Sequence, residues 1–559
     1  MGSTDEPKNP SSPYESSSPS QALLSKSYPS SSIEGGENES DEEQNHYPQI
    51  TFNYGPRRFQ DLPFMVLFII FSLSTFAFGI FSIAHRNPNS SEVSSYVYDS
   101  NSTSCVKQSL STPPLGLFHQ IFYLRSFSNY ASSSHFLSDL IWTLVITFIL
   151  SVPLALGLLW LLRHYTKQIV YLSLPFFLII PIFFNVYWFV ACTVKSNCRD
   201  AFPLAYRIVV LVFVFLIIGV IVWIIVANWH RIELTVRIVA VASEALARNM
   251  GLFGVLPLMI LGLVVYFVPI VVFLVFARLN GKIVSHVSKG SEEGYSCVWK
   301  PDSWVPAYYT LAILTMLWSA ATMVEAQAYV ISGTIAQWYF SKDHSPPRRS
   351  LRNSLRNAFG PSFGTVCFSG LIICVVRVVR AAVDSARRED VVPGIVNIIL
   401  RCCVNALLSA VDFLNKFTIN FAAITGECYC TSAKMTYELL RRNLLSAVFV
   451  ETVSSRILAG IIFVLSAVYA IVVWAILNAV SNLGVDAYFV SVLAWVLLIV
   501  VLGFFVHVLD NVIDTIYVCY AVDRDRGEVC KQDVHEVYVH LPISRNSRPS
   551  LATRTPLIV

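Results

Sequence analysis

Three side chains on one apolar stretch of the chain are of the types that bind an organic cation. Trp318, Glu325 and Tyr329 stand at positions i, i+7 and i+11, and a helix turning 100° per residue places all three within one stripe. A quaternary ammonium has no N–H to donate, so proteins hold it between aromatic ring faces and near a negative charge. The spacing therefore favours a cation site in which Glu325 supplies the charge. The alternative is that Glu325 hydrogen-bonds to another helix while the two rings only pack.

A second set of ionisable side chains lies near the end of the last apolar stretch. His507, Asp510 and Asp514 share one helical face, which Tyr517 continues. Ionisable residues inside a membrane span are costly and often mark proton or substrate paths, so this set could relay protons or form a gate. In the alternative interpretation, Asp510 and Asp514 lie just beyond the hydrocarbon and are solvated.

Asp412 and Lys416 form a third set, spaced i, i+4. That spacing predicts an ion pair within one helix, which requires no role in transport. The nearby Asn415 and Asn420 are of the type that hydrogen-bonds between membrane helices.

The elements that carry these residues must be membrane helices. The chain is 55% hydrophobic and only 14% charged, with a mean hydropathy of +0.58, whereas a soluble domain carries roughly a quarter charged residues. A helix crosses a bilayer with about 20 apolar residues. We therefore predict an all-α polytopic integral membrane protein with about ten transmembrane helices in a domain from 58 to 524. The ten apolar blocks are 62–84, 137–162, 169–192, 207–227, 252–277, 304–328, 361–381, 403–425, 456–478 and 487–509.

One short segment has the pattern of a helix that lies in the lipid headgroup region. Within RRSLRNSLRNAF, Leu351, Leu355 and Phe359 recur every four residues, and arginines line a neighbouring face. An apolar side facing the bilayer and a basic side facing anionic lipid is typical of interfacial helices. The alternative is a plain cytosolic loop.

Both ends of the chain are polar. Residues 1–57 and 525–559 are rich in polar and small residues, and such segments cannot bury a core, so we expect disordered tails. Arg57 and Arg58 directly precede the first span, and the positive-inside rule then places the N-terminus in the cytosol. Ten spans return the C-terminus to the same side.

This orientation makes 85–136 the first external loop. It contains two glycosylation sequons, at Asn89 and Asn101. Disulfides persist outside the reducing cytosol, and the disulfide candidates are the four cysteines in or beside predicted external loops. These are Cys105, Cys192, Cys198 and Cys297, and the sequence leaves their pairing open.

The topology of 361–425 is ambiguous. Arginines precede the block 361–381 and follow it, and the positive-inside rule draws both flanks to the cytosol although one crossing separates them. Either the block does not cross simply, or one basic stretch lies outside, or part of 390–425 re-enters the membrane.

The sequence lacks the motifs of several classes of enzymes and nucleotide-binding proteins at positions where they could function. We find no P-loop, HExxH, GxSxG or Rossmann fingerprint and no Cys or His spacing typical of a metal site. We therefore expect no enzyme, no cofactor, no bound metal and no nucleic-acid partner.

Three further stretches of the sequence resemble the motifs of a known protein family. They are SGTIAQWYF followed by RRSLRNSLRNAFGPSFGTVCFSGLI, then FLNKFTINFAAITGECYCTSAKMTYELLRRN, and DTIYVCYAVDRDRGE. Together they resemble the choline transporter-like family (solute carrier family 44), over roughly 300 to 528. The resemblance implies about ten spans with cytosolic termini, and sodium-independent transport of choline, with ethanolamine as a related substrate and proton exchange.

The sequence departs from the animal members of that family in its short first external loop, which resembles the plant and fungal branch. Phe417, Thr418 and Ile419 also replace the more usual Asn-Ala-Tyr, and Gln337 stands where a small residue is common. These departures bear on substrate identity more than on fold.

The resulting hypothesis is a facilitator or proton-coupled exchanger for choline-like cations. Glu325 would neutralise the ammonium, Trp318 and Tyr329 would supply ring faces, and His507 and Asp510, with Asp514, would couple protons or gate. We expect it in the plasma membrane, with Golgi or endosomal membranes as the other compartments, and in contact with membrane lipids. The alternatives are a trafficking or lipid-homeostasis protein that transports nothing, and a protein that moves lipids with choline or ethanolamine headgroups.

Overall fold

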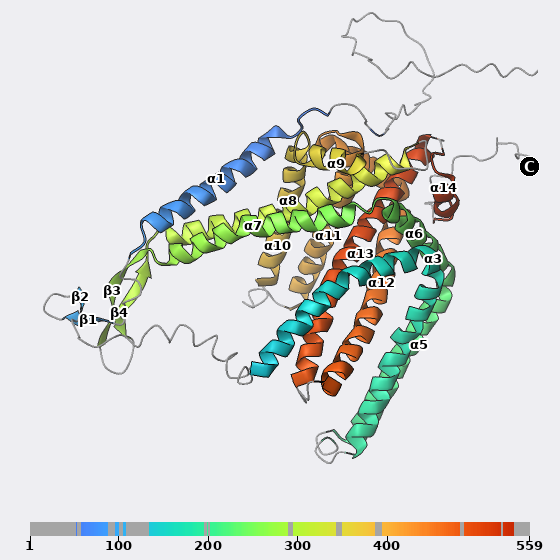
Figure 1. Ribbon diagram of the computed structural model, residues 1–559, viewed down its shortest axis with the longest axis horizontal. Helices are drawn as coiled ribbons and strands as arrows, with labels where there is room; N and C mark the ends of the chain where they lie inside the picture. Colours follow the sequence, from blue (N-terminus) through green and yellow to red (C-terminus); the bar gives the residue numbers. More distant parts are fainter. Residues whose placement is uncertain are drawn as a thin grey trace, which may run out of the picture. The chain divides into compact units, whose positions relative to one another are not determined.

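The computed structural model confirms an all-α membrane architecture (Figure 1). It describes residues 52, 57–87, 95–99, 104–107, 134–194, 198, 202–288, 294–341, 349–385, 394–480, 486–526 and 529–541. Nearly all of the predicted tail 1–57 lies outside these ranges. Within them, nine helices are long and apolar enough to cross a membrane. They are α1 (Leu62–Ala84), α3 (Ser134–Val194), α5 (Leu204–Ala227), α7 (Leu252–Arg278), α8 (Val305–Tyr339), α10 (Phe363–Ser385), α11 (Gly394–Thr425), α12 (Tyr429–Val480) and α13 (Asp486–Arg526).

The helix α3 contains two of the ten predicted spans. It is 61 residues long, and its helical backbone breaks at Tyr165, where φ is −130° and ψ is 28°. That residue lies between the predicted blocks 137–162 and 169–192. Since about 20 residues cross the hydrocarbon core, α3 is long enough for two crossings. Figure 1 shows it bending back so that its second half runs beside α5, with which it packs.

The helix α8 lies at the centre of the packing. It contacts α7, α10, α11 and α13, and every residue from Glu325 to Tyr339 is buried. Small residues allow these close approaches. A Cβ added at Gly370 of α10 would lie 2.6 Å from the Thr322 hydroxyl oxygen, and one at Gly333 would lie 2.9 Å from that of Ser354.

The ambiguous region 361–425 forms two long helices, α10 and α11, that pack against each other. Arg380, at the end of the block 361–381, forms an ion pair with Asp412 of α11 at 3.1 Å. An arginine with such a partner is a weaker orientation signal than a solvated one, so the conflict between the two flanks is reduced.

Two short helices lie outside the candidate spans. The predicted interfacial helix is α9 (Ser350–Ala358), and its Ser350, Ser354 and Ala358 are buried where it packs on α8. Leu355 is only partly buried against the same core. The other helix, α6 (Trp229–Arg248), packs on α3 and α13. Each therefore rests at least partly on other helices of the protein.

The sequence predicted no strands, but two antiparallel hairpins connect helices. Strand β1 (Tyr96–Asp99) pairs with β2 (Ser104–Lys107), and β3 (Gly281–Ser288) pairs with β4 (Gly294–Pro301). A disulfide from Cys105 to Cys297 joins the hairpins, and the rings of Tyr98 and Tyr295 stack at 4.4 Å. The chain segments before α3 and before α8 are therefore covalently linked.

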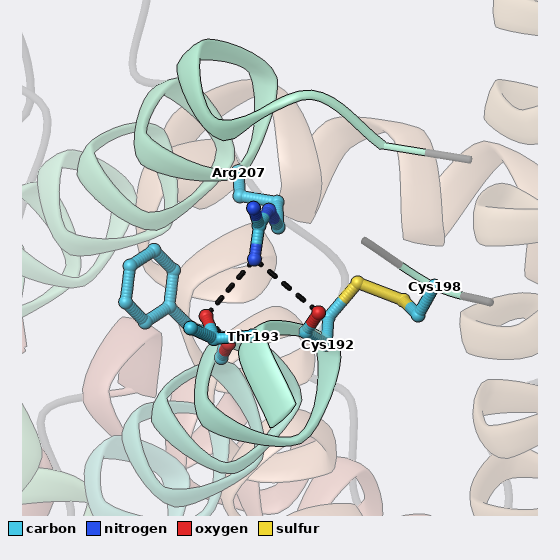
Figure 2. The surroundings of a disulfide bond; sticks show 5 residues. Cys192, Thr193, Cys198 and Arg207 are labelled. Atoms are coloured by element: carbon cyan, nitrogen blue, oxygen red, sulfur yellow. Dashed lines mark hydrogen bonds between the residues drawn. A yellow bond between two sulfur atoms is a disulfide. The ribbon is translucent and has the colours of Figure 1, made fainter. Parts of the chain in front are cut away.

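A second disulfide joins Cys192 to Cys198 in the connection between α3 and α5 (Figure 2). Arg207 lies beside it, buried, and its Nη1 donates to the Cys192 carbonyl at 3.3 Å and to the Thr193 hydroxyl at 3.0 Å. The four disulfide candidates are thus the four bonded cysteines, while the eight others, all within the described ranges, form no disulfide. The sequons at Asn89 and Asn101 lie outside the described residues.

Part of the expected disordered tail 525–559 is instead folded. Helix α14 (Gln532–Tyr538) packs on α6 and α13, with Val534 and Tyr538 buried. Burial, reinforced by the nearby Asp514, raises the pKa of the Tyr538 phenol well above its usual range. The buried Asp523 accepts hydrogen bonds from the Tyr339 hydroxyl at 2.9 Å and the Cys530 amide at 3.0 Å. These contacts hold the segment after α13 against the end of α8.

The disulfide pairing can be tested by peptide mapping. We expect a non-reduced digest of the purified protein to contain one peptide pair joined through Cys105 and Cys297, and separately a Cys192–Cys198 loop. Mass spectrometry before and after reduction measures both. Peptides that join Cys105 to Cys192 or Cys198 would contradict the arrangement of the hairpins.

Candidate functional site

The Glu325 carboxylate lies at a junction of four helices. It is 7% exposed, and one of its oxygens accepts a hydrogen bond from the Ser369 hydroxyl of α10 at 2.6 Å. The same hydroxyl lies 3.0 Å from the Asn415 side-chain oxygen of α11, to which the Tyr429 phenol of α12 donates at 2.6 Å. We call Glu325, Ser369, Asn415 and Tyr429 the Glu325 cluster. A serine has one proton to donate, so Glu325 and Asn415 compete for it.

Trp318 and Tyr329 are buried on the same helix as Glu325, but they contact other residues than the Glu325 cluster. The Trp318 indole donates to the Cys367 carbonyl at 3.0 Å, and Phe68 and Phe71 of α1 meet its ring edge-to-face at 5.2 and 5.6 Å. The Tyr329 phenol donates to the Ser362 hydroxyl at 2.8 Å and accepts from Arg57. Trp318, Glu325 and Tyr329 thus lie on one helix, as the spacing predicted, but the described contacts of the two rings are with residues outside the Glu325 cluster.

The segment before α1 makes hydrogen bonds to the ends of several helices. The sequence did not predict these contacts. Arg57, used above only as an orientation signal, donates to the Ala423 carbonyl near the end of α11 at 2.7 Å. One oxygen of Asp61 accepts from the Thr365 hydroxyl and from the Tyr429 amide, both at 2.7 Å. A carboxylate at a helix N-terminus accepts hydrogen bonds from the free amides there and interacts favourably with the positive end of the helix dipole. Asp61 therefore ties the starts of α10 and α12 together.

Lys416 of α11 is surrounded by carboxylates from two other helices. Its ammonium nitrogen lies 2.5 Å from Asp514, 3.1 Å from Asp510 and 3.5 Å from Glu451. Asp510 also accepts from the Ser455 hydroxyl at 2.7 Å. We call Lys416, Glu451, Asp510 and Asp514 the Lys416 cluster.

Two expectations are corrected by this cluster. The predicted ion pair between Asp412 and Lys416 is wrong, because Asp412 pairs with Arg380 of α10 and Lys416 with α12 and α13. The spacing i, i+4 permits a pair within the helix, but charges from packed neighbours approach more closely. Solvation of Asp510 and Asp514 is also wrong. Asp514 is completely buried, and the Asp510 side chain is 14% exposed.

His507 lies one turn before these carboxylates, beside Asn511. Its Nε2 is 3.3 Å from the Asn511 side-chain nitrogen, so the imidazole is within the same region of α13 without bridging the two aspartates. Among the described residues, no group of three His, Cys, Asp or Glu side chains has the arrangement of a metal site.

The Lys416 cluster contains more negative than positive groups. With every member ionised it would carry three carboxylates for one ammonium, and burying unbalanced charge costs several kcal/mol per ion. In addition, one oxygen of the buried Asp514 has no hydrogen-bond donor among the described residues. A proton or a further cation that joined the cluster would therefore reduce its net negative charge.

Comparison with known proteins shows what the chain is similar to. Residues 212–525 match the family model described as plasma-membrane choline transporter. A CTL-like protein of Dictyostelium discoideum is 26% identical over 239 residues, covering 40% of this chain and 43% of that protein. Human choline transporter-like protein 3 is 24% identical over 313 residues, covering 53% and 46%. The matches thus span less than half of each relative, and the matched range 212–525 holds both polar clusters.

The charge balance of the Lys416 cluster predicts that removing its ammonium lowers the stability of the protein. Lys416→Met leaves the buried Asp514 and the partly exposed Asp510 and Glu451 without their ammonium, and breaking a buried pair such as that of Asp514 from one side costs about 3–5 kcal/mol. We expect a clear fall in the thermal unfolding temperature of the purified protein in detergent, and partial recovery when Asp514→Asn is added.

Lys434→Met is the matched control, because Lys434 is exposed on α12. A Lys416→Met protein as stable as the control variant would mean that the ammonium does not hold α11 to α12 and α13.

Proposed function

This chain belongs to the plasma-membrane choline transporter family, and we propose from that premise that it moves choline or a related amino-alcohol cation across a membrane. It would work as a facilitator or as a proton-coupled exchanger. The Glu325 cluster is the observation that carries the proposal, since Glu325 is a buried carboxylate within a membrane span whose hydrogen-bond partner is a neutral hydroxyl. A carboxylate in such a place stabilises a cation that arrives as substrate.

The aromatic residues of the stripe would join the site when the helices move. Trp318 is now covered by α1, and Tyr329 is held by Arg57. For either ring to face a substrate cation, α1 and the segment before it must shift away from α8. Alternating access, in which helices rock around a binding site, supplies such a movement.

The neighbouring residues Asn415 and Lys416 offer a route for coupling. They are consecutive on α11, so their side chains point about 100° apart. Asn415 belongs to the Glu325 cluster and Lys416 to the other cluster. A rotation of α11 that follows substrate binding at Glu325 would therefore move the Lys416 ammonium among its carboxylates. Proton uptake by Asp514 or Asp510, with His507 as a nearby relay, would follow from that movement.

Both disulfides support an orientation with the hairpins and the α3–α5 connection on the external side, since disulfides persist in oxidising compartments. The termini would then be cytosolic. The plasma membrane is the compartment we favour, with Golgi or endosomal membranes as the other option, and the sequons at Asn89 and Asn101 would be available for glycosylation.

Uptake of radiolabelled choline into proteoliposomes tests the site. We expect saturable uptake by the unaltered protein, and Glu325→Gln should lower it by roughly tenfold or more, because a buried charge interaction of more than about 1.4 kcal/mol is lost. Glu233→Gln on α6 is the matched control, since that carboxylate is partly exposed and pairs with Arg237. If folded protein takes up neither choline nor ethanolamine, the result would favour the alternative, a trafficking or lipid-homeostasis protein.

A second experiment tests coupling. Asp514→Asn removes a protonatable group from the Lys416 cluster while keeping its shape, so we expect choline uptake that no longer responds to a pH gradient. Asp486→Asn at the start of α13 serves as control. Uptake by Asp514→Asn that still follows the gradient would exclude this carboxylate as the coupling group.

A further inference from the structure

The short helix α9 is fixed on α8 by one of its sides. An added Cβ at Gly333 of α8 would lie 2.9 Å from the Ser354 hydroxyl oxygen of α9, so the two helices are in close contact there. The Gln337 side chain of α8 donates to that hydroxyl at 3.0 Å and to the Ser350 carbonyl at 3.3 Å. Ser350, Ser354 and Ala358 are buried, and the side of α9 opposite to them therefore faces away from α8.

That opposite side is basic. Arg352 and Arg356 each stand two positions from Ser354, so at 100° per residue their side chains leave the helix roughly 160° away from it. Both are exposed, and so is Arg349 at the start of the helix. The contacts of Ser354 with α8 thus hold these three guanidinium groups outward.

The segment before α1 adds a fourth arginine beside the end of α9. The Gln60 amide donates to the carbonyl of Pro361, three residues after α9 ends, at 3.0 Å. Arg58 is exposed and stands two residues before Gln60, so its backbone lies within about 7 Å of chain from this contact. We define the arginine patch as Arg58, Arg349, Arg352 and Arg356.

The positive charge of the arginine patch is not neutralised by the described residues. None of its four guanidinium groups forms an ion pair with a residue in the described ranges, and the sequence from 345 to 383 contains no Asp or Glu. By contrast, the exposed Arg237 of α6 lies 3.6 Å from Glu233. A guanidinium group binds phosphate oxygens through two parallel hydrogen bonds. The patch is therefore complementary to an anion with several phosphates.

The arginine patch lies where membrane spans begin. Helix α8 starts after strand β4 and ends before α9, so α9 and the hairpins are at opposite ends of α8 (Figure 1). Helix α10 starts at Phe363, five residues after α9 ends, and α1 starts at Leu62. Beside these starts, Phe59 is 66% and Phe359 is 45% exposed. Aromatic rings at the ends of apolar spans are typical of the lipid headgroup level, which is also the level of the lipid phosphates.

We propose that the arginine patch binds a phosphoinositide, a membrane lipid whose inositol ring carries additional phosphates. The phosphates would lie on the guanidinium groups, with Phe59 and Phe359 among the surrounding lipids. Clusters of about four to eight basic residues next to a membrane span are typical of such sites. This surface goes beyond the proposed function and does not depend on it, because the lipid can bind whether or not the protein transports choline.

Binding of a fluorescent, short-chain phosphatidylinositol bisphosphate to the full chain in detergent tests the patch. The double variant Arg352→Gln and Arg356→Gln removes two outward charges and keeps the contacts of α9 with α8. We expect its dissociation constant to be roughly 10- to 30-fold higher than that of the unaltered protein. Binding to the unaltered protein should also weaken as the salt concentration rises, because salt screens exposed charges.

The matched control is the double variant Arg237→Gln and Lys434→Gln, which removes two exposed cations from α6 and α12 outside the patch. It should bind the lipid as the unaltered protein does, and the unfolding temperature of each variant establishes that it is folded. The proposal is overturned if the folded patch variant binds as tightly as the control variant. It is also overturned if both variants weaken equally, since binding would then depend only on the total surface charge.

Two further probes identify the anion. Inositol trisphosphate carries the phosphates without acyl chains, and Phe359→Ser should weaken the short-chain lipid by roughly 3- to 10-fold while leaving inositol trisphosphate unchanged. Phe59→Ser is the second variant with the same expected result. If neither serine variant weakens the lipid, the patch takes a soluble polyanion and the lipid assignment is wrong. If short-chain phosphatidylserine binds as tightly as the bisphosphate, the additional phosphates are not recognised and the proposal fails.

Discussion

Asn415 and Lys416 connect the two polar clusters of the membrane domain because they are consecutive residues on α11. Asn415 reaches towards Ser369 and Tyr429, and through Ser369 it shares a hydroxyl with Glu325. Lys416 reaches towards α12 and α13. In an apolar solvent each of these groups must find its partner inside the protein. The position of α11 therefore constrains α8, α10, α12 and α13 together.

The ends of these helices are held by separate contacts. Arg57 and Asp61 bind the end of α11 and the starts of α10 and α12. Asp523 binds the last residues of α8 through Tyr339. Two disulfides restrain the connections before α3, α5 and α8. Movement of α1 away from α8, which access to Trp318 requires, would first have to break the hydrogen bonds made by the segment at 57–61.

Composition and local spacing predicted some features of the structure and missed others. Long apolar blocks were predicted correctly, because a bilayer demands about 20 apolar residues for each crossing whatever the neighbours are. Two of the blocks, separated by the kink at Tyr165, form the single helix α3, which is long enough for two crossings. Partners of charged residues were predicted poorly, as the pairs made by Asp412 and Lys416 illustrate. The strands were missed as well, since strands of four and eight residues leave little signal in so apolar a chain.

The sequence by itself determined that the chain spans a membrane, which family its motifs resemble and which buried side chains deserved attention, because these depend on composition and local spacing. Only the tertiary structure decided what those side chains contact. Lys416 meets Asp510 across 94 positions of sequence, and Ser369 meets Glu325 across 44. Cys105 finds Cys297 across 192. Helical periodicity states which face a residue occupies, but the packing of distant helices decides what stands opposite, and in a membrane that packing decides how each buried charge is balanced.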